Sequence, residues 1–246
     1  MNSELLYFEQ FEAVTFDCYG TLIDWESGIL AGVRVILETH DIGDQDDNRI
    51  LERFGLLEAA AEAGAFRPYR SVLEEVAYGF GEAYGFVTGR EEARRFAESV
   101  SFWPPFSDSI TSLQLLSSRF RLAIVSNIDD DLFSNSSQQL GAVFEQVVTA
   151  EQVRSYKPDP AHFHEVLSRL KLPPERVLHV AQSLYHDIAP ATELGLKSVW
   201  VNRRAGKDGG GATKPSSAIP DLEVSDLMAL VDVVGIEKNL RTPVQL

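Results

Sequence analysis

The sequence predicts an α/β protein, a Rossmann-like, doubly wound parallel sheet with an all-helical insertion. Two observations carry this prediction. Short apolar runs that end in polar loops recur along the chain with helical patterns between them, and one long segment after the first run contains no convincing strand. Strands that alternate with helices indicate a parallel sheet covered on both faces. The length of 246 residues suits one ordinary core with a smaller inserted unit.

Each predicted strand is a short apolar run followed by polar or turn-forming residues. The first covers residues 13–17 (AVTFD), ends in an acid and leads into Cys18-Tyr19-Gly20-Thr21. The other strands are predicted at 121–126, 177–181 and 198–201, with a weaker case at 147–149. Helical patterns separate them at 109–118, 131–140, 160–170 and 188–194.

Residues 27–102 interrupt this alternation. Apolar residues recur there at helical spacing, as at Val72, Val76 and Phe80. The pair Pro104-Pro105 marks the return to the sheet, because two prolines cannot continue a helix. We therefore predict a core domain of residues 1–26 and 103–246 and a helical cap domain of residues 27–102.

Charge and composition restrict the partners and the location. The chain has 22 Lys and Arg against 37 Asp and Glu, a net charge of −15, which repels nucleic acid and anionic membrane surfaces. No apolar run approaches the roughly 20 residues that cross a bilayer, and the N-terminus lacks a signal-peptide pattern. The single cysteine, Cys18, fits a reducing compartment. We expect a cytoplasmic protein that binds neither nucleic acid nor membrane, and its helical insertion is compatible with a homodimer.

The candidate active site lies at one edge of the predicted sheet. Ligands of open parallel sheets bind outside the carboxyl ends of the strands. Seven polar side chains are expected at or near those ends: Asp17, Ser126, Asn127, Lys157, Gln182, Ser183 and Asp187. Each of them alone is explained equally well by a helix cap or a turn. Together they predict an active site at this edge.

The order of these residues carries a resemblance. Asp17-Cys18-Tyr19-Gly20-Thr21-Leu22 is followed by Ser126-Asn127, Lys157-Pro158 and Asp187. In this order the motifs resemble those of the haloacid dehalogenase superfamily over nearly the whole chain. The resemblance implies that the chain is an enzyme, a hydrolase, and that residues 27–102 are its helical cap.

Tyr19 separates two branches of that superfamily. Phosphatases of the superfamily carry a second Asp at this position as general acid and base, a task for which a phenol of pKa about 10 is poorly suited. They also hold Mg²⁺ through acids of the last motif, where this chain has Gln182 and retains only Asp187. We therefore predict no metal and no other cofactor. A phosphatase that depends on Mg²⁺ is the alternative.

Tyr19 is also the feature that makes the chain similar to the type II 2-haloacid dehalogenases. That resemblance implies that Asp17 displaces a leaving group from a small C2-substituted carboxylate and that water then hydrolyses the aspartyl ester. It implies that Thr21 orients Asp17, that Lys157 keeps Asp17 ionised, and that Asp187 positions Lys157 or the water. Substrate contacts are implied for Tyr19, Ser126, Asn127, Gln182 and Ser183.

Two features depart from the dehalogenase pattern. Leu184 stands where those enzymes carry Asn, which leaves the positioning of water and the substrate range open. The cap arginine that would bind the substrate carboxylate has three candidates, Arg49, Arg53 and Arg70. Arg70 is favoured, because it lies at a predicted helix start beside aromatic residues.

Two further interpretations stay open. Residues 16–26, Ser183–Asp187 and Arg203–Lys207 resemble hydrolases that open the C–N ring of azetidine-2-carboxylate. That reaction would use the same nucleophile on a similarly small carboxylate. A catalytically idle interaction protein of this fold is opposed by the joint presence of Asp17, Lys157 and Asp187 with Ser126.

Overall fold

The computed structural model of the chain describes residues 6–237. Six parallel strands form one sheet in the order β3-β2-β1-β4-β5-β6, with helices on both faces. The strands are β1 (Ala13–Phe16), β2 (Arg121–Ser126), β3 (Gln146–Thr149), β4 (Val177–Ala181), β5 (Lys197–Val201) and β6 (Leu222–Val224). The predicted fold class and the five predicted strands are confirmed. β6 was not predicted, because this three-residue edge strand pairs only with β5 and is too short to show a pattern.

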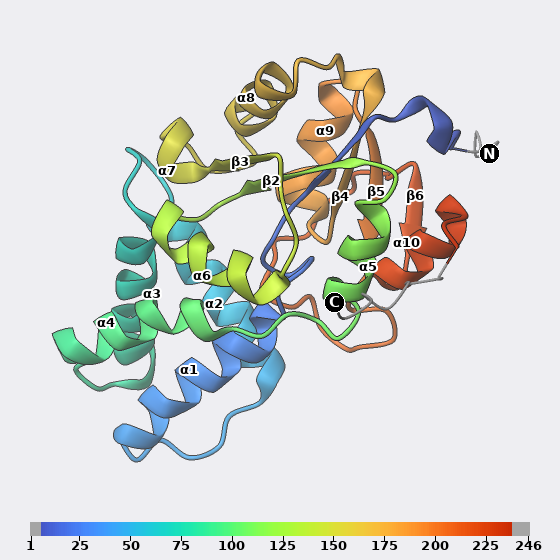
Figure 1. Cartoon of the computed structure of the whole chain (residues 1–246). Coiled ribbons are helices and arrows are strands. Elements are labelled where there is room, and N and C mark those ends of the chain that lie inside the picture. Colours follow the sequence, from blue (N-terminus) through green and yellow to red (C-terminus); the bar gives the residue numbers. More distant parts are fainter. Residues whose placement is uncertain (1–5, 238–246) are drawn as a thin grey trace, which may run out of the picture.

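Helices flank the sheet between the strands (Figure 1). The helices outside the insertion are α5 (Ser109–Leu116), α6 (Asp130–Leu140), α7 (Ala150–Val153), α8 (Ala161–Leu170), α9 (Ala189–Glu193) and α10 (Leu227–Val234). Three short turns of helix join them: η1 (Phe8–Gln10), η3 (Pro174–Arg176) and η4 (Leu184–Ile188). No described helix is both long and apolar enough to cross a membrane.

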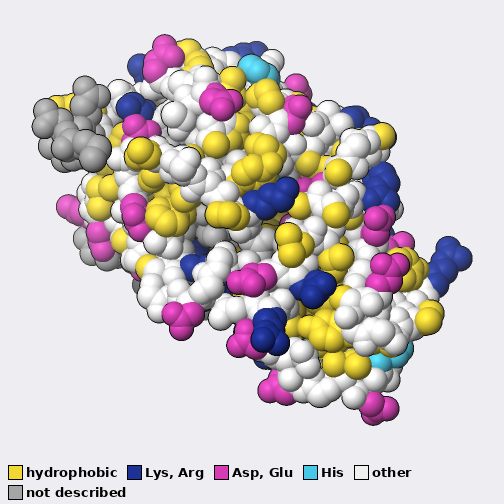
Figure 2. All heavy atoms as spheres, turned by 180° about the vertical axis from the view of Figure 1, so that it is seen from behind, with side chains coloured by type: hydrophobic (Ala, Val, Ile, Leu, Met, Phe, Trp, Pro, Cys, Tyr) yellow, Lys and Arg dark blue, Asp and Glu magenta, His cyan; other side chains and the backbone are white. Residues whose placement is uncertain are grey.

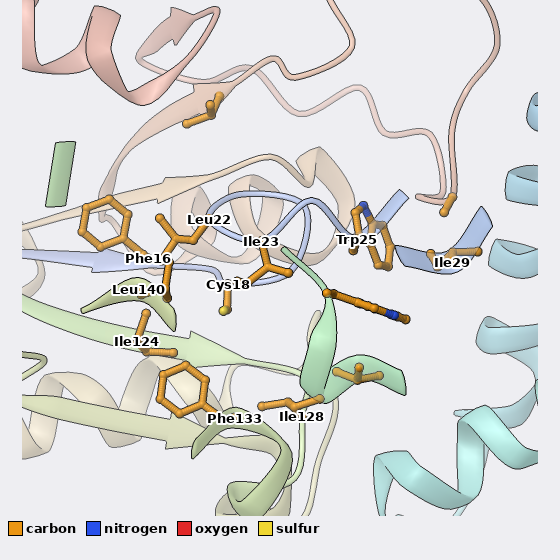
Figure 3. Close-up of a cluster of buried hydrophobic side chains, with 14 of the residues drawn as sticks. Phe16, Cys18, Leu22, Ile23, Trp25, Ile29, Ile124, Ile128, Phe133 and Leu140 are labelled. Carbon is orange, nitrogen blue, oxygen red and sulfur yellow. The ribbon is translucent and has the colours of Figure 1, made fainter. Parts of the chain in front are cut away.

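The central strand β1 is buried on both faces. Its four residues and the last five of β2 are all buried, as a parallel sheet covered on both sides requires. Val14, Phe16 and Ile124 belong to the larger apolar cluster, whereas Ala13 and Val125 belong to the cluster on the opposite face. In Figure 3, Phe16 and Ile124 lie in the same apolar layer as side chains of α6. Cys18 is buried in the same layer.

The insertion after β1 is helical. Its elements are α1 (Trp25–Thr39), α2 (Asp47–Ala61), α3 (Tyr69–Tyr84), α4 (Arg90–Glu98) and η2 (Ser99–Phe102), and its residues include no strand. These helices lie together beside the sheet in Figure 1. The division into a core domain and a cap domain stays a prediction, because buried side chains of the insertion and of the sheet belong to one continuous apolar cluster.

Two contacts seat the insertion on the sheet. A β-carbon at Gly28 of α1 would overlap the indole of Trp103, so glycine permits this close packing. Asp129 of the sheet region accepts hydrogen bonds from the first two amides of α3, Tyr69 N at 2.8 Å and Arg70 N at 2.9 Å. A carboxylate at a helix N-terminus satisfies amides that have no partner within the helix. The start of α3 is thereby held beside Asp129, three residues after the end of β2.

The surface carries charges of both signs. On the face shown in Figure 2, acidic and basic side chains are interspersed rather than gathered into separate areas. Large apolar side chains that are strongly exposed, such as Val87, Phe102 and Val143, come from distant parts of the chain. Singly exposed apolar residues are ordinary on a protein surface. The homodimer therefore stays a prediction.

Candidate active site

A buried ammonium joins two carboxylates at the carboxyl ends of β1 and β4. Lys157 Nζ donates to Asp17 Oδ1 at 2.9 Å, to Asp187 Oδ1 at 2.7 Å and to the carbonyl oxygen of Val125 at 2.9 Å. Only 1% of the Lys157 side chain is exposed. All three ammonium protons are therefore used, and Lys157 is held in one position. The structure brings together these three residues, as expected from the strand ends.

Thr21 fixes the other oxygen of Asp17. The Thr21 hydroxyl donates to Asp17 Oδ2 at 2.8 Å and accepts a hydrogen bond from the backbone N–H of Gln182 at 2.8 Å. A hydroxyl has one proton, and the amide directs that proton of Thr21 toward Asp17. The carboxylate of Asp17 is thus held at both oxygens, by Lys157 on one side and by Thr21 on the other.

His179 supports Asp187 from the middle of β4. An ionised carboxylate only accepts, so His179 Nε2 donates to Asp187 Oδ1 at 3.1 Å, and His179 Nδ1 accepts from the Thr15 hydroxyl at 2.9 Å. The register of the sheet places Thr15 beside His179. His179 was not among the predicted site residues. The only available signal was a histidine inside an otherwise apolar strand.

The charges of the site shift one another. Burial raises the pKa of Asp17 above its ordinary value; Lys157 opposes the rise and Asp187 adds to it. Burial alone would raise the pKa of Asp187, but the charge of Lys157 and the hydrogen bond from His179 outweigh this effect and lower the pKa to about 2. Burial disfavours the Lys157 ammonium, yet the two carboxylates prevail and raise its pKa. At neutral pH the site holds a permanent cation beside an ionised Asp187.

A cavity of about 40 Å³ opens onto Asp17. Five of the six residues predicted to contact substrate line it: Tyr19, Ser126, Asn127, Gln182 and Ser183. A groove of about 630 Å³ shares Gln182 and Thr213 with the cavity but does not include Asp17 or Lys157. The larger groove is an approach to the site at most, since the reactive groups surround the small cavity. The small cavity therefore suits a small ligand beside Asp17.

Two of these lining residues already use their polar groups. The Asn127 amide exchanges hydrogen bonds with the backbone of Lys157, accepting from its N–H at 2.7 Å and donating to its carbonyl at 3.2 Å. Asn127 therefore positions the segment that carries Lys157. The Tyr19 hydroxyl is 2.9 Å from Ser136 Oγ of α6, and burial raises the pKa of Tyr19 well above its ordinary value. Tyr19 is a neutral wall of the cavity rather than an acid or base.

Ser126 differs from these residues. Its side chain is 1% exposed, and its Oγ has no hydrogen-bond partner within the described part of the chain. A buried hydroxyl without a protein partner is costly, so one that lines a cavity is suited to bond to a ligand or water there. Ser126 is thus the lining residue with an unused donor and acceptor.

The structure does not bring Arg70 to the cavity, which corrects its predicted role in binding substrate. Its guanidinium pairs with Asp131 of α6 at 2.9 Å, and about a third of its side chain is exposed. The physical reason is this ion pair, because it holds the guanidinium beside α6 and outside the cavity. The other candidates, Arg49 and Arg53, are exposed on α2.

The insertion presents acids to the cavity instead. Glu58 of α2 and Glu62, the residue that follows α2, both line it, as does Tyr69 of α3. The Tyr69 hydroxyl donates to Glu58 Oε1 at 2.5 Å. Burial raises the pKa of Glu58 to about 7, and burial together with the charge of Glu58 raises the pKa of Glu62 well above its ordinary value. Sequence reasoning missed both acids, because nothing local to α2 shows which of its faces meets the strand ends.

The described residues include no group of three or more His, Cys, Asp or Glu side chains arranged to hold a metal ion. The absence of a cofactor stays a prediction that activity measurements must test.

Comparisons with known proteins agree on one family. The family described as haloacid dehalogenase-like hydrolase matches residues 14–201. (S)-2-haloacid dehalogenase H-109 of Pseudomonas putida is 26% identical over 227 residues, which cover 90% of this chain and 96% of that protein. (S)-2-haloacid dehalogenase 1 of Pseudomonas sp. (strain CBS-3) is 24% identical over 198 residues, which cover 78% of this chain and 84% of that protein. A structure of L-2-haloacid dehalogenase from Xanthobacter autotrophicus with chloropropionic acid covalently bound has a TM-score of 0.76 at 21% identity. The match covers 91% of this chain and 98% of that one.

Proposed function

Because the chain belongs to the haloacid dehalogenase-like hydrolases, we propose that it displaces a leaving group from a small C2-substituted carboxylate through an ester of Asp17. The observation that carries the proposal is the carboxylate of Asp17 at the cavity, held by Lys157 at 2.9 Å and by Thr21 at 2.8 Å. Because hydrogen bonds hold both of its oxygens, the carboxylate can attack without first losing rotational freedom.

The proposed reaction has two steps. An oxygen of Asp17 forms a bond to C2 of the substrate, and the leaving group departs with the electron pair of its bond. Water then attacks the ester at Cγ of Asp17, the acyl C–O bond breaks, and the product keeps the oxygen that came from Asp17. Lys157 offsets negative charge near Asp17 in both steps.

Asp187 has a positioning role in this proposal. A carboxylate with a pKa of about 2 is a weak base at neutral pH and is poorly suited to activate water. Its hydrogen bonds to Lys157 at 2.7 Å and to His179 at 3.1 Å suit it to hold the ammonium in place. The Xanthobacter enzyme with its covalently bound chloropropionic acid is an analogy at the level of the fold for a covalent route.

The phosphatase alternative has less support. It needs an acid at position 19 to protonate the leaving alcohol, and the neutral Tyr19 hydroxyl is committed to Ser136. It also needs acidic ligands for Mg²⁺ in the last motif, where Gln182 stands. Release of phosphate from phosphate esters that depends on Mg²⁺ would favour it.

Isotope labelling tests the ester route. In a single turnover in ¹⁸O-labelled water, with enzyme in excess over 2-chloropropionate, label is expected in the peptide that contains Asp17 and not in the first product. The matched control is Asp17→Asn, which should lose activity by several orders of magnitude with its fold intact. Label in the first product with none in Asp17 would exclude the ester. Activity of freshly purified Asp17→Asn, without deamidation by mass spectrometry, would remove Asp17 from its role.

A further inference from the structure

The active-site cavity has an acidic wall that the proposed reaction does not use. Glu58 is in the last turn of α2, and Glu62 is the residue that follows this helix and keeps a helical backbone conformation, so the two side chains, four residues apart, lie on the same side. Both line the cavity of Asp17, and Glu58 is 6% exposed. Neither residue lies in the motifs that carry the nucleophile. The wall is an addition of the helical insertion to the site.

The charge balance of the cavity is unfavourable to a purely anionic ligand. Four carboxyl groups line it, from Asp17, Glu58, Glu62 and Asp187. Lys157 is the only lysine or arginine among the lining residues within the described chain, and its three protons are already taken. Lys214 acts on Glu62 from outside the cavity, where it lines the larger groove. A substrate carboxylate would meet no free cation at the wall formed by α2.

The acceptors of this wall are largely unused. The Glu62 carboxylate has no hydrogen bond or ion pair with any described residue, and Glu58 accepts only from Tyr69. Two neighbouring carboxyl groups, of which Glu58 is buried and Glu62 half-buried, disfavour each other's charge, which a bound cation would relieve. Trp25 and Tyr69 line the same cavity, and aromatic side chains beside carboxylates form sites that suit an ammonium group.

We propose that the substrate carries an ammonium group and that Glu58 and Glu62 bind it. The substrate is then a small zwitterion, an amino-substituted carboxylate, rather than a simple haloacid. The unpartnered hydroxyl of Ser126 in the same cavity is a donor available to the carboxylate end. The inference rests on the proposed function for the displacement at C2, but the binding of the ammonium group is independent of it.

A matched pair of substrates tests this selectivity. 4-Amino-2-chlorobutyrate and 2-chlorobutyrate share the leaving group and the chain length and differ only in the ammonium group. We expect kcat/KM to be at least tenfold higher for the amino compound, and this ratio to fall at least fivefold in Glu62→Gln. The control is Glu38→Gln, which removes the same charge from an exposed position of α1 and should keep the ratio. A ratio of one or less in the unmodified enzyme, or a ratio that Glu62→Gln leaves unchanged, would overturn the proposal.

A binding measurement separates this inference from the proposed reaction. If neither chlorobutyrate is turned over, the displacement fails, and calorimetry with the unreactive pair 4-aminobutyrate and butyrate decides the rest. Binding of 4-aminobutyrate that is at least tenfold tighter than that of butyrate, and that weakens in Glu62→Gln but not in Glu38→Gln, would support the acidic wall as an ammonium site. Equal binding of the two compounds, or no binding of either, would refute it.

Discussion

Replacement of Lys157 by Met should lower the free energy of unfolding by about 3–5 kcal/mol at pH 7. Methionine is a flexible side chain of similar length, so the loss is not that of a cavity. It arises because Asp17 and Asp187, of which 9% and 1% are exposed, would lose their shared cation. Asp187 would retain the hydrogen bond from His179, whereas Asp17 would retain only that from Thr21.

The distances give the scale of this effect. At 2.9 and 2.7 Å, each attraction amounts to about 6 kcal/mol at an effective dielectric constant of about 20. Burial of the ammonium costs several kcal/mol, which reduces the net loss to the stated range. Without Lys157 the folded-state pKa of Asp17 rises further above its unfolded value. The destabilisation should therefore grow as the pH rises and shrink as it falls, because protonation removes the unpaired charge.

Urea unfolding followed by tryptophan fluorescence measures the effect. With a slope of about 2–3 kcal/mol per molar urea, the midpoint at pH 7 should fall by about 1–2 M in Lys157→Met and by less at pH 5. The matched control is the double variant Lys157→Met with Asp17→Asn, which removes one unpaired carboxylate and should regain at least about 1 kcal/mol. A stability of Lys157→Met within about 1 kcal/mol of the unmodified protein, or no recovery in the double variant, would refute this reasoning.

Three further predictions follow from individual contacts. Burial raises the pKa of Glu58 from 4.5 to about 7, so ionisation of this carboxyl group destabilises the folded protein as the pH rises through this interval. Glu58→Gln should therefore be more stable than the unmodified protein by up to about 3 kcal/mol at pH 8 and equal to it below pH 4. A difference between the two urea midpoints that does not change with pH would contradict this. Thr21→Val leaves the backbone N–H of Gln182 without its acceptor and removes the hydroxyl that donates to Asp17. It should lower the free energy of unfolding in urea by about 1–3 kcal/mol and kcat by about 10–100-fold. Two unchanged values would show that Thr21 does not orient Asp17. Exhaustive dialysis against EDTA should leave the turnover of 2-chlorobutyrate or its amino analogue within twofold of its starting value, and recovery only on addition of Mg²⁺ would show a metal requirement.

The strands and the residues that follow them could be predicted because their signals are local. β1 is a run of four buried residues, and in a parallel sheet its carboxyl end is necessarily close to those of β2 and β4. Asp17 and Ser126 therefore had to lie at one edge once the sheet was predicted. Lys157 could be assigned by its order in the motifs, although no pattern in the sequence shows that its side chain returns to Asp17.

The contributions of the helical insertion could not be predicted in this way. An amphipathic helix such as α2 shows which side chains are apolar, but not which of its acids meet a cavity formed by another part of the chain. Glu58 reaches the site only because α2 and α3 are seated over the strand ends, partly through Asp129. The prediction for Arg70 failed for the same reason. Its position at a helix start was correct, but Asp131 on a distant helix determines where its charge lies.

The two parts of the site therefore differ in what they determine. The sheet supplies Asp17, Thr21 and Lys157 in a tightly hydrogen-bonded arrangement that suits one kind of reaction. Tyr19 supplies no proton to that reaction, because its hydroxyl bonds to Ser136 and its pKa is raised. Glu58 of the insertion, by contrast, lines the cavity with a pKa of about 7, close to neutral pH. If a substrate nitrogen or oxygen needs a proton on leaving C2, Glu58 is the side chain whose pKa suits that transfer, whereas a halide needs none. The proposed nucleophile thus follows a strand of the sheet, whereas the lining carboxyl group with a pKa of about 7 comes from the insertion.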